Sequence, residues 1–216
     1  MIKDIYTEEE RKLLSECTLC PRECGADRLR GGTGYCRSDA GMNIASICFH
    51  RGEEPPVSGP DGICNIFFSG CNLRCIYCQN HEISRSCREL RDSSPDYDKA
   101  LERIIRILDS GMQAVGFVSP SHVVPQVKAI IRGLNARGYR PVTVYNTNAY
   151  DKPGVIDSLD GVIDVYLPDY KYYSPVLSEN YSDAGDYPGV AFNTIKRMYY
   201  QKGSVLRTDD DGRAEN

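Results

Sequence analysis

The sequence predicts an α/β fold built from parallel βα units and preceded by a small cysteine-rich N-terminal module. From Ile63 onward, short apolar runs alternate with segments whose apolar residues recur at helical spacing, a pattern typical of βα units. Between Cys17 and about Pro60, Gly, Pro, Cys and Arg dominate and apolar periodicity is weak, so this stretch cannot fold on a hydrophobic core alone. We therefore expect a metal-binding module at residues 1–60 and one main core at residues 61–216.

Four βα units follow one another in the second part. Their strands are expected at residues 63–68, 114–118, 142–145 and 162–167. A cysteine loop follows the first strand, and the helix of that unit lies around Leu90 or is irregular. The later helices are expected at residues 98–110, across Val127 to Leu134, near residues 155–159 and at about residues 190–201.

Four parallel strands leave an exposed sheet edge, which proteins normally close or cover. The chain stops where a fifth strand would begin. We therefore expect a chain that is truncated after about four βα units, or one that relies on a partner to cover the edge.

The bulk composition argues against two classes of partner. A net charge of −4, with no Trp and no basic stripe, does not suit a surface that coats nucleic acid, because phosphate binding needs clustered Lys and Arg. The apolar runs are far shorter than the roughly 20 residues that span a bilayer. Residues 1–10 are charged and helical in pattern and do not resemble a signal peptide. These observations predict a cytoplasmic protein without nucleic-acid or membrane partners.

Ten cysteines are the outlying feature of the composition. In a reducing compartment, closely spaced cysteines are more often metal ligands than disulfides. The isolated ones are expected to be small buried hydrophobic residues; they are Cys48, Cys64 and Cys87. The other seven form an N-terminal cysteine group, Cys17, Cys20, Cys24 and Cys36, and a central cysteine group, Cys71, Cys75 and Cys78.

The central cysteine group directly follows a predicted buried strand, at the carboxyl end where α/β folds place their chemistry. Three cysteines can hold three irons of a [4Fe-4S] cluster and leave the fourth iron open for an exogenous ligand, whereas electron-carrying clusters normally have four cysteines. The alternative is a zinc loop completed by His81 or Cys64, because structural zinc takes four N or S ligands. The unusual spacing and the preceding strand favour the cluster.

The spacing C-x3-C-x2-C, with Tyr77 directly before the last cysteine, resembles the radical S-adenosylmethionine superfamily. The resemblance implies that the open iron of a [4Fe-4S] cluster binds the amino and carboxylate groups of S-adenosylmethionine. It implies that the reduced cluster cleaves this molecule to a 5′-deoxyadenosyl radical, and that Tyr77 lies against the adenine.

At a finer level the chain resembles the pyruvate formate-lyase activating enzyme-like proteins of the PflX-type branch. The motifs that carry this resemblance are CTLCPRECG at residues 17–25, GYC at 34–36, GEEPP at 52–56 and FFSGCNLRC at 67–75. The resemblance implies a partial TIM-type (β/α)6 barrel and an oxidoreductase that uses an electron donor such as flavodoxin or ferredoxin. It also implies a protein substrate, such as a glycyl radical enzyme.

Polar residues after the later strands complete the site that this resemblance implies. Ser119 and Ser121 stand where such enzymes have a Gly-Gly-Glu-type loop that holds the methionyl ammonium group, and their oxygens can accept its N–H groups. The alternative is that the residues after these strands belong to ordinary turns or solvated loops. The expected contacts of the ribose and carboxylate groups are Asn146, Asn148, Asp169 and Lys171.

The N-terminal cysteine group offers four thiols, enough for a tetrahedral zinc site or for a complete second iron-sulfur cluster. The sequence does not separate these two, and a third alternative leaves the thiols reduced and without metal. For the whole protein, two alternatives stand beside cleavage of S-adenosylmethionine. One is a non-catalytic iron-sulfur electron carrier or scaffold, and the other is a zinc-dependent interaction module.

Overall fold

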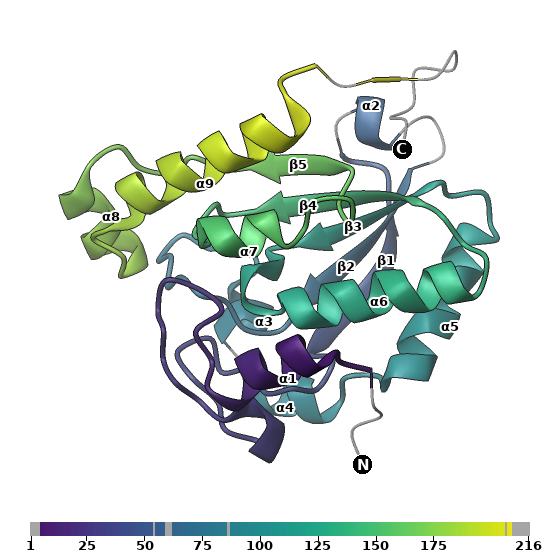
Figure 1. Cartoon of the computed structure of the whole chain (residues 1–216), viewed down its shortest axis with the longest axis horizontal. Helices are drawn as coiled ribbons and strands as arrows, with labels where there is room; N and C mark the ends of the chain where they lie inside the picture. The colour runs from purple at the N-terminus through teal and green to yellow at the C-terminus, as the bar shows by residue number, and fades with distance from the viewer. Residues whose placement is uncertain (1–4, 54, 59–61, 86, 206, 209–216) are drawn as a thin grey trace.

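The computed structural model describes residues 5–53, 55–58, 62–85, 87–205 and 207–208. At its centre lies a five-stranded sheet with the order β1-β2-β3-β4-β5 (Figure 1). Strand β1 pairs antiparallel with β2, and the later neighbours pair in parallel. The strands are β1 (Ile44–His50), β2 (Ile63–Phe68), β3 (Ala114–Val118), β4 (Val142–Thr147) and β5 (Val165–Pro168).

The sheet confirms the α/β class and the parallel order of the βα units, and it corrects the prediction at two places. Strand β1 was not predicted, because only Ile44 of its residues is fully buried and the apolar pattern is weak. Strand β5 begins at Val165 and not at residue 162, because the preceding segment forms a turn in which Asp164 accepts the N–H of Thr143 at 2.7 Å.

Two finer predictions about the architecture are not confirmed. Strand β1 lies inside the expected module at residues 1–60 and pairs with β2, so a separate cysteine-rich module is not confirmed. The sheet of the described residues is open, with β1 and β5 at its edges, and does not by itself define a partial TIM-type barrel. Glu54 of the GEEPP motif and residues 1–4 of the expected helical N-terminus lie outside the described residues.

Helices of the described chain flank this sheet. The helix expected around Leu90 is α4 (Cys87–Asp92), and the later expected helices correspond to α5 (Tyr97–Leu108), α6 (Val124–Ala136), α7 (Pro153–Asp157) and α9 (Tyr187–Lys202). Helix α8 (Pro175–Ser182) was missed because its buried face consists of Ser178 and Ser182 and lacks apolar periodicity. Among the described residues, no helix combines the length and apolarity needed to cross a membrane. The helices are α1 (Glu8–Ser15), α2 (Pro55–Ser58), α3 (His81–Arg85), α4 (Cys87–Asp92), α5 (Tyr97–Leu108), α6 (Val124–Ala136), α7 (Pro153–Asp157), α8 (Pro175–Ser182) and α9 (Tyr187–Lys202), with 3-10 turns η1 (Arg28–Arg30) and η2 (Pro120–His122).

Helix α5 illustrates how local sequence sets these elements. The side chain of Asp96 caps its start by accepting the N–H of Lys99 at 2.9 Å. After its last residue the chain turns away at Gly111, whose φ of +112° few other residues adopt. The buried face consists of Ala100, Leu101, Ile104 and Leu108, which recur at helical spacing.

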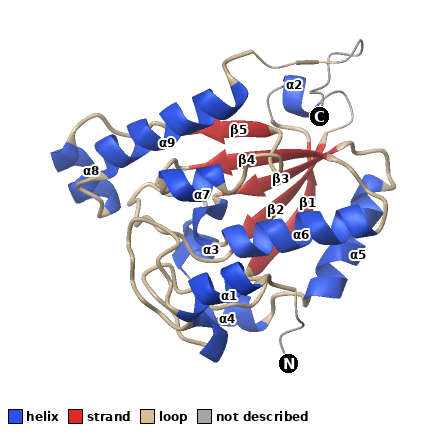
Figure 2. Cartoon of the chain, viewed as in Figure 1, coloured by secondary structure: helices blue, strands red, loops and turns tan. Residues whose placement is uncertain are grey.

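Both faces of the sheet are covered, but unequally. On one face Cys64, Ile66 and Phe68 of β2 lie in the main hydrophobic core, together with residues of α5, α6, α7 and α9 (Figure 2). On the other face Ile63 lies in a smaller apolar cluster with Val144. Burial on both faces explains why the strands are almost continuously apolar, as in other parallel sheets.

The register of the sheet brings the carboxyl ends of the parallel strands to one edge. Phe67 of β2 pairs with Val118 of β3, which pairs with Asn146 of β4. Thr147 of β4 then pairs with Pro168 of β5. The loops that carry the predicted site residues therefore all leave the sheet at this edge, as expected for parallel strands.

Candidate metal centre

The central cysteine group lies at the carboxyl edge of the sheet, in the loop that follows β2. Gly70 allows a close approach to the N-terminal loop, because a Cβ there would lie 2.2 Å from the carbonyl oxygen of Cys36. The N–H of Gly70 donates to the carbonyl of Ile83 at 3.0 Å, and Nε2 of His122 lies 3.0 Å from the carbonyl oxygen of Ser69. The start of the cysteine loop is therefore held from three separate segments.

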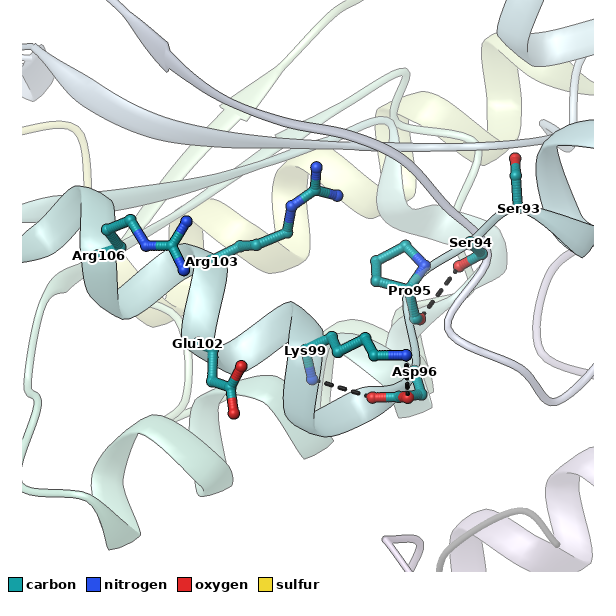
Figure 3. A pocket seen from close by; sticks show the side chains of 8 residues that line it. All are labelled: Ser93, Ser94, Pro95, Asp96, Lys99, Glu102, Arg103 and Arg106. Atoms are coloured by element: carbon teal, nitrogen blue, oxygen red, sulfur yellow. Dashed lines mark hydrogen bonds and ion pairs between the residues drawn. The ribbon is translucent and has the colours of Figure 1, made fainter.

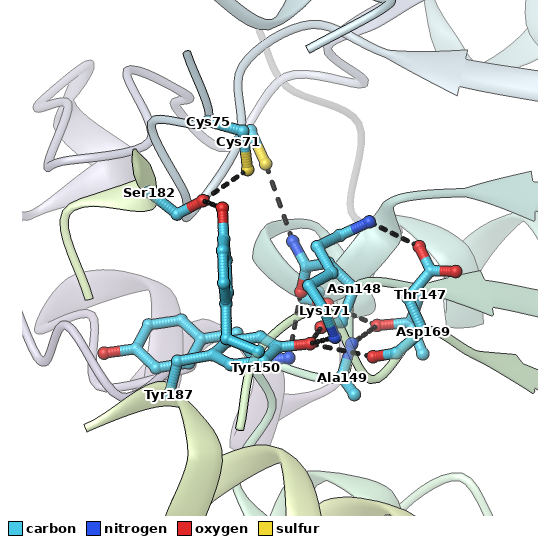
Figure 4. A network of polar contacts seen from close by, with 12 residues as sticks. Cys71, Cys75, Thr147, Asn148, Ala149, Tyr150, Asp169, Lys171, Ser182 and Tyr187 are labelled. Carbon is cyan, nitrogen blue, oxygen red and sulfur yellow. Dashed lines mark hydrogen bonds and ion pairs between the residues drawn. The ribbon is translucent and has the colours of Figure 1, made fainter. Parts of the chain in front are cut away.

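The sulfur of Cys71 receives two N–H donors. The side-chain amide of Asn148 lies 3.6 Å from Sγ (Figure 4). The backbone N–H of Leu73 lies 3.4 Å from the same sulfur. Desolvation raises the pKa of Cys71 to about 12, and charge repulsion from Cys75 and Cys78 adds to this rise. Cys75 and Cys78 are thus close enough to oppose ionisation of Cys71, and a bound cation would relieve that repulsion.

Helices α8 and α3 each contact one of the other two sulfurs of the central group. The hydroxyl of Ser182 donates to Sγ of Cys75 at 3.0 Å, and its carbonyl accepts the N–H of Arg74 at 3.1 Å. Sγ of Cys78 lies 3.4 Å from the hydroxyl of Ser84 in α3. Ser182 could not be identified from the sequence, because a serine on an unpredicted helix carries no recognisable pattern.

Tyr187, at the start of α9, joins the loops that follow β4 and β5. Its hydroxyl lies 2.9 Å from the carbonyl oxygen of Asn148 and 2.8 Å from that of Asp169. The same hydroxyl accepts the backbone N–H of Lys171 at 2.9 Å. Its ring packs edge-on against Tyr172 with centroids 5.6 Å apart. This buried tyrosine was not predicted as a site residue. In the sequence, a tyrosine that joins two site loops looks the same as one that only packs in the core.

The residues predicted to contact S-adenosylmethionine lie in different parts of the site. Asp169 and Lys171 lie together, with Nζ of Lys171 donating to Oδ2 of Asp169 at 2.6 Å. Tyr77 is 54% exposed and packs edge-on against Tyr172 with centroids 6.3 Å apart. Asn146 is half-buried at the end of β4. The structure brings Asn148, Asp169 and Lys171 around one tyrosine, and the contacts of all these residues with a ligand stay predictions.

The loop after β3 is organised around a buried carboxylate. Ser119 has a left-handed backbone with φ +50°, and Ser121 is fully buried. The hydroxyl of Ser121 donates to Asp151 at 2.9 Å, and Thr147 and Tyr145 donate to the same carboxylate at 2.7 and 2.9 Å. Burial raises the pKa of Asp151, and the three hydroxyls oppose that rise. Ser121 is therefore already engaged inside the protein.

The N-terminal cysteine group surrounds a small cavity of about 10 Å³ that all four of its cysteines line, together with Arg28 and His122. Three of the four are buried, and Cys24 is exposed. Within the described ranges the cysteines are free thiols, and no set of three or more His, Cys, Asp or Glu side chains forms a preassembled metal-binding cluster. The two predicted ligand sets are thus brought into neighbourhoods by the fold but are not confirmed as metal sites.

The isolated cysteines whose side chains are described differ in burial. Cys64 is buried in the main core, as predicted, which removes it as a ligand in the central loop. Cys48 is half-buried on β1 and so is more exposed than predicted. His81, the other suggested zinc ligand, is exposed at the start of α3. The side chain of Cys87 lies outside the described residues.

A second cavity, of about 510 Å³, lies beside the start of α5 (Figure 3). Its charged groups are partly compensated, because Nζ of Lys99 lies 3.2 Å from Oδ2 of Asp96. None of the predicted site residues lines it. The cavity is lined by Ser93, Ser94, Pro95, Asp96, Lys99, Glu102, Arg103 and Arg106.

Comparison with known proteins gives two relatives, and no protein-family model matches the chain. The chain is 29% identical to an uncharacterized protein of Methanocaldococcus jannaschii over 199 residues, which are 91% of this chain and 56% of that relative. It is 31% identical to a 7-carboxy-7-deazaguanine synthase of Methanopyrus kandleri over 161 residues, which are 65% of this chain and 62% of that relative. The chain thus spans little more than half the length of these curated relatives. The second similarity supports a radical S-adenosylmethionine type of function at the level of the superfamily.

Proposed function

We propose that this chain holds a [4Fe-4S] cluster through Cys71, Cys75 and Cys78 and uses it for the reductive cleavage of S-adenosylmethionine. The observation that carries the proposal is the position of the C-x3-C-x2-C loop, at the carboxyl end of β2 and in contact with the loop after β4. The similarity to a 7-carboxy-7-deazaguanine synthase supports the same superfamily.

The donor set fits such a cluster. Three thiols lie in one loop, and charge repulsion from Cys75 and Cys78 adds to the raised pKa of Cys71, so a positively charged centre among them would be stabilising. Three cysteines leave one iron open for an exogenous ligand. When bound, the cluster supplies the electron that breaks the sulfur–C5′ bond of S-adenosylmethionine and releases the 5′-deoxyadenosyl radical.

The protein's own residues tune and frame this centre. The amide of Asn148 and the hydroxyl of Ser182 donate to the sulfurs of Cys71 and Cys75, and such donors stabilise the charged sulfur and help set a cluster's reduction potential. Lys171 would pair with the carboxylate of S-adenosylmethionine. The carboxylate of Asp169, which pairs with Lys171 in this structure, would accept a hydrogen bond from a ribose hydroxyl. Because the two side chains are paired, ligand binding has to exchange part of that ion pair.

The finer predictions rest on the motif resemblance alone. They are a pyruvate formate-lyase activating type of oxidoreductase, an electron donor such as flavodoxin or ferredoxin, and a protein substrate. The alternative function, a non-catalytic electron carrier, differs in one measurable property. Its cluster would be reduced and oxidised reversibly without responding to S-adenosylmethionine.

Anaerobic reconstitution with iron and sulfide, followed by electron paramagnetic resonance of the reduced protein, tests the proposal. We expect addition of S-adenosylmethionine to change the signal, because the open iron takes a new ligand, and we expect 5′-deoxyadenosine to form. Cys75→Ala should lose the part of the signal that responds to S-adenosylmethionine. Cys48→Ala should keep it, since this half-buried thiol lies on β1 and outside the loop.

Two outcomes would contradict the proposal. A cluster whose signal ignores S-adenosylmethionine, with no 5′-deoxyadenosine formed, would favour the electron carrier. Equal iron uptake by Cys75→Ala and Cys48→Ala would show that the central cysteine group does not supply the ligands.

A further inference from the structure

The N-terminal cysteine group lies in a loop that folds back on itself. The N–H of Cys17 donates to the carbonyl of Ala26 at 3.1 Å, and the N–H of Gly25 donates to the carbonyl of Cys17 at 3.0 Å. Glu23 has a left-handed backbone with φ +40°, an unusual conformation for a residue with a side chain. These contacts close residues 17–26 into a tight turn, and Cys36 comes to the same cavity from the following segment.

The sulfur of Cys24 packs closely against the backbone of the same loop. A Cβ at Gly34 would lie 2.1 Å from Sγ of Cys24, so only glycine fits beside that thiol. All four thiols line one cavity of about 10 Å³, and Cys17, Cys20 and Cys36 are buried there. Four thiols around one small cavity are the ligand set that a thiophilic cation takes.

A buried arginine lies beside the same sulfurs. Arg28 is only 1% exposed, and its guanidinium donates to the carbonyls of Asp39 and His122, each at 2.8 Å. Nη1 of Arg28 also lies 3.8 Å from Sγ of Cys17. An arginine stays charged at all physiological pH values, and burying that charge is costly unless negative charge lies nearby. Metal-bound thiolates would supply that negative charge.

We propose that the N-terminal cysteine group binds a metal centre through four thiolates, separate from the central cysteine group. The chemistry is that of a thiophilic metal held by four cysteines, which both a zinc ion and an iron-sulfur cluster accept. The four thiols are not preassembled into such a centre within the described structure. Metal binding therefore draws them together and orders the loop at the same time.

This centre fixes the part of the chain that touches the central loop. Nε of Arg22, which lies between two cysteines of the N-terminal group, donates to the carbonyl of Asn72 at 3.0 Å. Arg74 donates to the carbonyl of Tyr35, the residue before Cys36, at 2.8 Å. These two arginine hydrogen bonds join the N-terminal loop to the central loop. A metal that orders the N-terminal loop would therefore also fix its position against the central loop.

Cysteine alkylation in the wild-type chain tests the proposal without any substitution. The chain is stripped by a chelator under anaerobic conditions, then loaded with Zn²⁺ alone or with Fe²⁺ and sulfide, and treated with iodoacetamide before mass spectrometry. We expect one of the two loadings to slow alkylation of Cys24 by at least about tenfold, because the reactive thiolate becomes a ligand. Cys48 serves as the internal control and should react equally in every sample.

Metal analysis of variants separates this centre from the proposed cluster. The triple variant Cys71→Ala, Cys75→Ala, Cys78→Ala should retain the metal and the protection of Cys24, although it cannot hold the cluster of the proposed function. The pair Cys20→Ser, Cys36→Ser should lose both. Equal alkylation of Cys24 with and without each metal in the wild-type chain, or loss of the protection in the triple variant, would overturn the proposal.

Discussion

The N-terminal cysteine group is enclosed mainly by residues close to it in the sequence, whereas the central cysteine group is framed by segments that come much later. Within the first group, Gly34 and Arg28 contact the sulfurs. Within the second, Ser182 and Asn148 contact the sulfurs from α8 and from the loop after β4. One group of thiols is thus assembled by a local loop, and the other is assembled by contacts across the whole fold.

The difference matches the two general kinds of metal site in proteins. Structural sites are closed by four protein ligands, whereas catalytic sites keep a position open for a substrate or solvent ligand. Three of the four N-terminal thiols are buried, whereas all three central thiols are half-buried. The comparison therefore predicts that perturbing distant helices disturbs the central group first and leaves the N-terminal group in place.

The largest effect is expected for Tyr187→Ala. This substitution removes a fully buried ring and the hydroxyl that joins the loops after β4 and β5, so we expect a loss of about 3–5 kcal/mol in the free energy of unfolding. Urea denaturation measures it. Tyr200→Ala, on the exposed side of the same helix, is the matched control and should change stability by about 0.5 kcal/mol or less.

If the two substitutions had equal effects, α9 would not be the support of the central site. Alkylation of Cys24 in the metal-loaded Tyr187→Ala chain sharpens the comparison further. It should stay slow, because no contact of Tyr187 reaches the N-terminal loop among the hydrogen bonds and ring contacts described for it.

A slightly smaller effect is expected on acidification, through the histidine that lies between the two groups. Burial lowers the pKa of His122 from 6.5 to about 4, and the nearby charge of Arg28 adds to this shift. Between these two pKa values, His122 is protonated in the unfolded chain and neutral in the folded chain. Stability that is present above pH 6.5 is therefore lost as the pH falls toward 4. The shift corresponds to roughly 3 kcal/mol.

Denaturation curves recorded above and below this pH window measure the loss. His122→Gln should flatten the dependence on pH, whereas His81→Gln, which removes an exposed imidazole, should leave it unchanged. An identical slope in both variants would mean that another group causes the acid sensitivity.

The smallest effect is expected for Ser182→Ala, which removes the hydroxyl that donates to Cys75. Groups that hydrogen-bond to metal ligands typically contribute about 10–100-fold in metal affinity, so we expect iron retention against a chelator to fall by about tenfold. Ser178→Ala is the matched control, because this serine lies on the same helix and donates to the carbonyl of Pro175 instead of a sulfur. Equal iron retention in the two variants would show that the hydroxyl of Ser182 in α8 does not support the cluster.

Most of the fold could be predicted because its signals are local. Strands β2 and β3 have the predicted bounds, since each is a short apolar run that ends at a turn residue. Helix α5 was expected at residues 98–110 from one apolar stripe and lies at Tyr97–Leu108. Strand β1 and helix α8 escaped prediction for the opposite reason, because their buried positions are few or are occupied by serine.

The candidate site divides in the same way. Spacing alone identified the two cysteine groups and placed Asp169 and Lys171 at one strand end, where they form an ion pair. Spacing could not show that Ser121 donates to the buried Asp151, because a hydroxyl at a strand end looks the same whether it faces a ligand or the interior.

By itself, the sequence determined the parallel βα order, the main apolar core and the two cysteine groups, because each depends on periodicity or spacing over a few residues. Only the tertiary structure decided which groups meet the sulfurs. Ser182 and Asn148 reach the central loop from distant segments, and Cys36 closes the N-terminal cavity from beyond the turn. Such contacts form only when the chain is folded, since they depend on where helices and loops pack and not on their own local sequence.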